Sequence, residues 1–211
     1  MNGIRTRFQR DEQGATMVEL GLVLPVFLLI FLGMIDFGRL AFHIATAEKA
    51  MYLAARIATV RAAACPDVPT HNTRGTIDPN VTPPRFGKKC SGGANVCSNP
   101  GDISCTGDSS NATALEIWNR IQLTLPPGTT ISNLKFTYSR DIDLGFLGGP
   151  YVPIVTVELQ GVSFGFISPL GGLMALASGD SSAADGWSAT IPFPAMSTSI
   201  PGEDLALGTD G

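Results

Sequence analysis

Residues 20–35 read LGLVLPVFLLIFLGMI, an apolar run of 16 residues without a charged side chain. Extended back to Ala15, the run has 21 residues, and Glu19 carries its single charge. An α-helix of 21 residues spans roughly 31 Å, about the thickness of the hydrocarbon core of a bilayer. The run therefore predicts a transmembrane helix over residues 15–38.

Two other structures are alternatives for an apolar run near an N-terminus. A core helix is rarely apolar on every face, which disfavours a buried helix. A cleavable secretory signal has an apolar core of about 7 to 15 residues, closely followed by a small-residue cleavage site. Here the first such site, residues 45–47, lies well beyond the end of the run. A transmembrane helix fits better than either alternative.

The charges that flank the run predict its orientation. Three arginines precede the run, and the sequence that follows residue 36 is far less basic. Because basic residues remain on the cytoplasmic side of a membrane, we expect residues 1–14 in the cytoplasm and the C-terminal part across the membrane. The three arginines are Arg5, Arg7 and Arg10.

The composition of the whole chain excludes several classes of protein. Charged residues make up 15% of the 211 residues, against roughly 25% in soluble domains, so a simple cytosolic globule is a poor fit. With 44% hydrophobic residues and a net charge of −4, the chain is too apolar and too weakly charged to be disordered throughout. A pI of about 5.1 gives no basic footprint for nucleic acid, so we expect no nucleic-acid partner.

Two residues of the apolar segment are unusual there. A carboxylate at the edge of a bilayer is costly unless it is paired or protonated, so Glu19 is a candidate functional residue. Pro25 lacks a backbone N–H and clashes with the preceding turn, so it predicts a kink in the helix.

The sequence at the start of the run resembles a type IV prepilin processing site. In that family a membrane peptidase cuts after a Gly, and a Glu occupies the fifth position of the mature chain. Gly14 and Glu19 have this offset, and residues 1–14 form a short basic leader like that of the type IVb group.

Longer strings resemble the TadE-like family, which comprises pilin-like proteins of the tight adherence (Tad) pilus of bacteria and archaea. The strings are RDEQG and VEL on either side of the processing site, LVLP at residues 22–25 and IDFGR at residues 35–39. The resemblance is tight over residues 10–39, looser in the C-terminal third and absent in the cysteine-containing middle.

The resemblance implies cleavage between Gly14 and Ala15 and an assembly role for Glu19. It implies a minor pilin or pseudopilin of a Tad (Flp, type IVb-like) pilus, which takes part in pilus assembly and surface adhesion. The implied partners are the prepilin peptidase, other pilin and minor pilin subunits, and the inner-membrane assembly platform. The implied location is the inner membrane, in a single pass with the C-terminus in the periplasm, or an extracellular pilus after processing. The TadF branch, and an unprocessed membrane protein with a partner-binding periplasmic head, remain alternatives.

Residues 39–64 are expected to extend the helix beyond the membrane. Ten alanines and no Gly or Pro lie between residues 41 and 64, which favours helix. Apolar and small side chains recur at a 3/4 spacing and predict a stripe that packs against the head or against neighbouring subunits. The stripe consists of Phe37, Leu40, Ile44, Ala47, Met51, Ala54 and Ala58.

Residues 65–112 read as a loop with little core of its own, because they contain six Gly and six Pro. All four cysteines lie in this loop, and an even number on the non-cytoplasmic side predicts two disulfides. Zinc is disfavoured because no pair of cysteines has the spacing of a zinc site, and we expect no metal. The sequence leaves three pairings open among Cys65, Cys90, Cys97 and Cys105.

A helix is expected to begin the head, which covers residues 113–201. Thr113 and Glu116 have the spacing of a capping box, and two prolines follow Leu125 and stop the helix. Its expected buried face consists of Leu115, Trp118, Ile121 and Leu125.

Alternating residues predict an antiparallel sheet of about three strands. Two strands are expected at residues 134–138 and 155–159, and a third, confined to an edge by its prolines, near 187–197. Residues 164–178 are apolar and interrupted by Gly, and packing under the sheet, contact with the membrane and contact with a partner all remain open. The tail over 202–211 is expected to be disordered. The fold class is therefore α+β, with the sheet packed on the distal end of the long helix.

The sequence contains no recognisable catalytic motif. Its two histidines, His43 and His71, lie in the juxtamembrane helix and the cysteine loop, and residues 87–89 lack the flanking residues of a P-loop. We therefore expect a non-enzyme without a cofactor.

Overall fold

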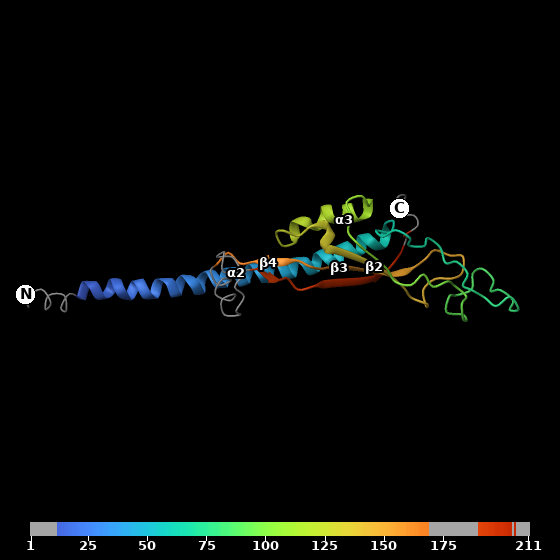
Figure 1. The fold of residues 1–211 in the computed structure, drawn as a ribbon, viewed down its shortest axis with the longest axis horizontal. Helices are drawn as coiled ribbons and strands as arrows, with labels where there is room; N and C mark the ends of the chain where they lie inside the picture. Colours follow the sequence, from blue (N-terminus) through green and yellow to red (C-terminus); the bar gives the residue numbers. More distant parts are fainter. Residues whose placement is uncertain (1–11, 169–189, 204, 206–211) are drawn as a thin grey trace, which may run out of the picture. The chain divides into compact units, whose positions relative to one another are not determined.

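A computed structural model describes residues 12–168, 190–203 and 205. These residues form one long helix, one short helix, two 3₁₀ turns and six strands, which confirms the predicted α+β class (Figure 1). The predicted leader, apolar segment, third strand and tail lie partly outside the described residues, namely at 1–11, 169–178, 187–189, 204 and 206–211.

The chain divides into two compact units. The helix unit contains the chain up to Phe42 together with the residues from Gly165 to Ile191. The head unit contains His43–Phe164 and the residues from Pro192 onward.

Helix α2 (Glu12–Val60) has 49 residues and continues through Pro25 without a break. The long predicted helix is thereby confirmed, and a kink at Pro25 stays a prediction. The predicted end at Ala64 is wrong, since the helix ends at Val60.

Side chains of the head cause this earlier end. Thr113 Oγ1 donates a hydrogen bond to the carbonyl of Ala62 at 2.7 Å, and the N–H of Ala64 donates to the hydroxyl of Tyr138 at 2.8 Å. Backbone groups that would extend the helix are therefore satisfied by the head instead. The alanine-rich composition of this segment favours helix locally, but the tertiary contacts override it.

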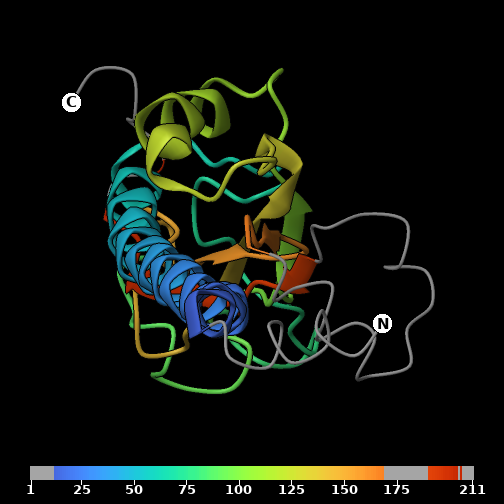
Figure 2. The ribbon, with the colours of Figure 1, turned by 90° about the vertical axis from the view of Figure 1, so that its left-hand side faces the viewer.

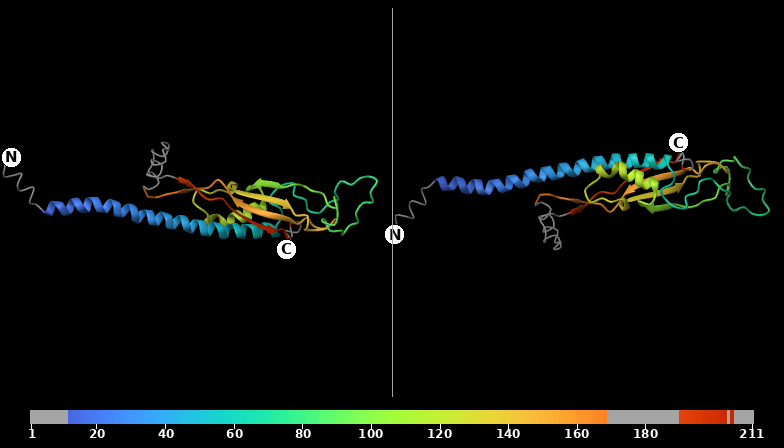
Figure 3. Two further views of the ribbon diagram at one scale, coloured as in Figure 1. Left: turned by 90° about the horizontal axis from the view of Figure 1, so that it is seen from below. Right: turned by 90° about the horizontal axis from the view of Figure 1, so that it is seen from above.

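The part of α2 inside the head unit buries one face. This face confirms the distal half of the predicted stripe, and it consists of Ala47, Ala50, Met51, Ala54, Ala55 and Ala58. Small side chains let the helix approach closely, and this part of α2 runs alongside the sheet in the views of Figures 2 and 3. Phe37, at the other end of the stripe, is exposed.

The main sheet has four antiparallel strands rather than about three. In spatial order they are β1 (Ile103–Thr106), β2 (Leu134–Arg140), β3 (Pro153–Leu159) and β6 (Met196–Pro201). The two central strands β2 and β3 match the predicted ones, and their alternate side chains are buried. Strand β1 falls in the segment predicted as loop. Its four residues alternate between half-buried and exposed, but none of them is buried and the run is too short to give a strong strand signal.

The third predicted strand is in fact two strands. Strand β5 (Thr190–Pro192) forms a separate two-stranded sheet with β4 (Ser163–Gly165), and β6 follows after a break of three residues. The break contains Pro194, which cannot donate to a strand ladder. Only β6 occupies the predicted edge of the main sheet.

Helix α3 (Ala112–Ile121) begins two residues earlier than the capping box at Thr113 predicted. Its N-cap is Asn111, whose side chain accepts a hydrogen bond from the N–H of Ala114, so the predicted capping box does not form the cap. Two residues of the predicted buried face are buried, namely Ile121 and, just beyond the helix, Leu125. The buried residues are Thr113, Ala114, Ile117 and Ile121, whereas Leu115 and Trp118 of the predicted face are exposed and half-buried.

All four cysteines form disulfides, as predicted, and the structure selects the pairing. Cys65 bonds to Cys105 across 40 residues, and Cys90 bonds to Cys97 across 7 residues. The second disulfide packs with Val96 and with Leu147 of the β2–β3 connection in a small buried cluster. The cysteine loop therefore relies on a neighbouring loop for its core.

Candidate functional site

The predicted processing and assembly residues lie near the start of helix α2. Gly14 and Ala15 are helical, and Glu19 follows Ala15 by four residues on the same helix. A rise of 1.5 Å per residue places Glu19 about 6 Å from Ala15 along the helix axis. Glu19 is exposed, so its carboxylate is accessible to a partner outside the chain.

An exposed apolar surface extends from these residues along the helix. Most large apolar side chains from Met17 to Phe37 are exposed, with exposed fractions from 38% at Leu32 to 75% at Met17, and Leu29 is half-buried. Helix α2 is the one helix of the described residues that is long and apolar enough to cross a membrane. Because apolar surface is unfavourable in water by about 25 cal/mol per Å², this helix requires an apolar environment. It indicates a single-pass membrane protein.

Asp36 lies at the end of the apolar surface and is 1% exposed. Its two carboxylate oxygens accept hydrogen bonds from the N–H of Ile167 at 3.2 and 3.1 Å, and one of them accepts from the N–H of Ser168 at 2.7 Å. Arg39, one turn further along α2, donates to the other oxygen at 3.0 Å. All four residues belong to the helix unit.

Sequence reasoning did not assign this role to Asp36. In the sequence Asp36 is recognisable only as part of the IDFGR string, and its partners at 167 and 168 are 131 and 132 positions away. One local signal was available, because Asp36 is the first charge after the apolar run and Arg39 stands at the i+3 position.

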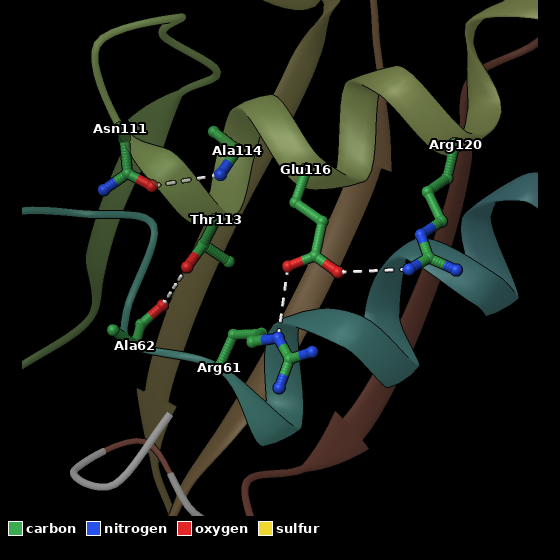
Figure 4. Close-up of polar contacts among 7 residues, drawn as sticks. All are labelled: Arg61, Ala62, Asn111, Thr113, Ala114, Glu116 and Arg120. Carbon is green, nitrogen blue, oxygen red and sulfur yellow. Dashed lines mark hydrogen bonds and ion pairs between the residues drawn. The ribbon is translucent and has the colours of Figure 1, made fainter. Parts of the chain in front are cut away.

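Within the head unit, polar contacts join α3 to the end of α2 (Figure 4). Glu116 accepts from Arg61 at 3.1 Å and from Arg120 at 3.5 Å. Beside them lies an open surface depression of about 630 Å³, lined by Ala112, Leu115, Glu116, Asn119 and Arg120. Glu116 is the carboxylate of this depression, and its two arginine partners form an ion-pair arrangement that joins α3 to the residue following α2.

The described residues offer little for catalysis or metal binding. They contain no group of three or more His, Cys, Asp or Glu side chains that could hold a metal ion. All four cysteines are consumed in disulfides, and His71 is exposed and hydrogen-bonded to Thr70 at 2.9 Å. His43 packs its ring against Phe164, with 5.9 Å between the ring centroids.

A comparison with protein families identifies the membrane segment. Residues 14–56 match the TadE-like protein family. The TadE-like match begins at Gly14, includes Glu19, Pro25 and Asp36, and ends before the first cysteine. It therefore confirms the resemblance for helix α2 and does not cover the sheet. Comparisons with curated proteins and with solved structures found no match.

Proposed function

We propose that this chain is a minor pilin or pseudopilin of a Tad pilus, cleaved by a prepilin peptidase between Gly14 and Ala15. The observation that carries the proposal is the TadE-like match, which starts at the glycine itself and follows helix α2. The family is a structural component of a pilus, so the match supports a non-enzymatic role. We expect no catalytic residue and no cofactor.

The exposed surface of α2 suits both environments that a pilin meets. Lipid surrounds the helix before assembly, and the helices of other pilin subunits would surround it afterwards. Both environments are apolar, so transfer between them need not expose the side chains from Met17 to Phe37 to water. The inner-membrane assembly platform would act at this transfer.

Glu19 is the proposed assembly residue. Removal of residues 1–14 creates an α-amino group on Ala15, about one helical turn from the Glu19 carboxylate. In a filament the carboxylate can pair with the amine of an adjacent subunit, which neutralises both charges in an apolar core. Unpaired buried charges are strongly destabilising. The axial offset between neighbouring subunits that pairs the two charges is therefore favoured over other offsets.

The head is proposed to face the periplasm and, after assembly, the outside of the cell. Two disulfides are compatible with an oxidising compartment. Four large apolar side chains of the head loops are exposed, namely Val81, Phe86, Ile142 and Phe146. Exposed apolar side chains of this kind support a role in adhesion or in contact with other subunits.

Processing is the step that tests the proposal most directly. The full chain is produced with its peptidase, and mass spectrometry of the membrane-extracted protein gives the N-terminus. We expect the chain to begin at Ala15. Gly14→Leu should block cleavage, since a bulky side chain prevents close approach of the backbone to the peptidase. Gly21→Leu is the matched control, because open space surrounds that position and cleavage should continue.

A chain that begins at Met1 in cells with active peptidase would contradict the proposal. It would favour the alternative of an unprocessed single-pass protein whose periplasmic head binds a partner.

A further inference from the structure

Helix α2 is covered at one place within its apolar part. Between Met17 and Phe42, the two buried residues are Gly33 and Asp36, which stand three positions apart on one face of the helix. Segment Gly165–Ser168 of the helix unit supplies the partners of Asp36. This segment therefore lies against α2 where the apolar run ends.

The carboxylate of Asp36 fixes the backbone of this segment. Burial of a carboxylate is costly unless hydrogen bonds and an opposite charge compensate it. Two successive backbone N–H groups and the guanidinium of Arg39 do so here. Hydrogen bonds to a charged acceptor are stronger than neutral ones, so the contact is well suited to hold a segment that is far away in sequence.

The side chains of the segment point in two directions. Phe166 is buried and meets the ring of Phe37 edge to face, with 6.0 Å between the ring centroids. Ile167 is 73% exposed. Phe166 therefore packs on the helix, whereas the side chain of Ile167 points away from it.

The position along the helix indicates which environment Ile167 meets. Asp36 and Arg39 are the first charges after 16 uncharged residues, so they mark the boundary between the hydrocarbon core and the headgroups. Arg39 is part-exposed, as expected for a cation that reaches lipid phosphates. Continuity with the exposed apolar surface of α2 makes a lipid surface the occupant that fits Ile167.

We propose that Asp36 holds Gly165–Ser168 at the non-cytoplasmic boundary of the membrane, where Ile167 enters the lipid interface. The protein then contacts the bilayer at a second point beside its spanning helix. Asp36 is a positioning residue in this arrangement, because it acts through the backbone of residues 167 and 168. The contact does not depend on cleavage after Gly14.

Fluorescence quenching in vesicles tests the proposal. The full chain carries Ile167→Cys labelled with an environment-sensitive fluorophore, in phosphatidylcholine–phosphatidylglycerol vesicles with or without brominated acyl chains. The four native cysteines are all in disulfides, so the new thiol is the one that reacts. We expect strong quenching by the brominated lipid and weak quenching by aqueous iodide. The opposite pattern would overturn the proposal.

Variants of the carboxylate test its positioning role. Asp36→Ala should cause a several-fold loss of lipid quenching at position 167, while a label at Ile35→Cys on the helix itself keeps its quenching. Asp36→Asn retains an acceptor oxygen and should keep part of the effect. Glu19→Gln removes another carboxylate of the same helix and should change nothing at position 167.

Intact disulfides in each variant report that the head has folded. Unchanged lipid quenching in Asp36→Ala with intact disulfides would show that the carboxylate does not hold the segment at the membrane, and the proposal would fail.

Discussion

At the scale of single residues, Glu19 has an assembly role only if the chain enters a filament. Glu19→Gln should leave membrane insertion and cleavage largely intact, while pilus assembly and surface exposure of the head fall sharply, because the charge partner of the neighbouring amine is lost. Glu48→Gln is the matched control, since Glu48 is also exposed on α2 but lies in the head unit. Surface labelling of intact cells and recovery of sheared filaments measure the effect.

Two results would change this interpretation. Normal filaments in Glu19→Gln would favour a stationary anchor or an initiator that does not need this contact. Loss of cleavage in Glu19→Gln would mean that the peptidase itself recognises Glu19.

Tyr138 connects the end of α2 to the sheet. Its ring is fully buried, and its hydroxyl accepts the N–H of Ala64 at 2.8 Å. Tyr138→Phe leaves that buried N–H without its acceptor, so we expect a loss of about 1–3 kcal/mol in the free energy of unfolding. Urea unfolding of the full chain in detergent measures this loss. Tyr52→Phe, at an exposed position of α2, should lower the free energy of unfolding much less.

The same tyrosine predicts sensitivity to alkaline pH. Burial raises the pKa of Tyr138 above its usual value, and the hydrogen bond from Ala64 opposes this only in part. Above about pH 10 the phenol ionises in the unfolded chain before it ionises in the folded one, so stability is lost as pH rises through this range. Tyr138→Phe should therefore lose less stability between neutral and alkaline pH than the parent protein does. An equal pH dependence in both proteins would contradict this.

At the scale of elements, the two disulfides should differ in their effect on stability. Loop-closure entropy predicts about 4 kcal/mol for Cys65–Cys105, which spans 40 residues, and about 2.5 kcal/mol for Cys90–Cys97, which spans 7. Replacement of each pair by serines, followed by denaturant unfolding, measures the two contributions. The short disulfide serves as the control for the long one. A larger loss on removal of Cys90–Cys97 would contradict the chain-entropy argument.

Elements with a strong local signal could be predicted from the sequence. The apolar and alanine-rich composition predicts α2, and strict alternation predicts β2 and β3, because burial of one face imposes these periods. Strand β1 escaped prediction because it is a short edge strand without a buried face. The buried face of helix α3 was predicted in part: Ile121 and Leu125 are buried as expected, whereas Leu115 is exposed and Trp118 is half-buried. The N-cap is Asn111 rather than the expected capping box.

In the candidate site, too, residues that form a local sequence pattern could be predicted, whereas contacts between residues far apart in the sequence could not. Gly14, Ala15 and Glu19 could be proposed from a pattern of six consecutive residues. The disulfide pairing and the contacts of Asp36 depend on residues that the fold brings together across 40 and 131 positions. No local period encodes such contacts, so they required the structure.

At the scale of the whole molecule, the helix and the head meet different demands. The TadE-like match ends at Arg56, so it covers the apolar part of α2 and also the first part of the helix that the head covers. The head obtains its order from a small sheet, a buried face of α2 and two disulfides. Disulfides of this kind form in an oxidising compartment, which links the chemistry of the head to the orientation of the helix.

That link predicts the topology of the intact protein. In cells that lack the peptidase, a thiol at Thr6→Cys should react with a membrane-impermeant maleimide only after the inner membrane is opened, because the arginines of residues 1–14 are expected to hold this end in the cytoplasm. A thiol at Leu123→Cys, which is 93% exposed, should react as soon as the outer membrane is permeabilised. The two variants, each with one added free thiol, serve as controls for each other, since both retain the native disulfides. Reaction of Thr6→Cys from the periplasm would reverse the proposed orientation, and the two disulfides would then stand in a reducing compartment where such bonds are rarely maintained.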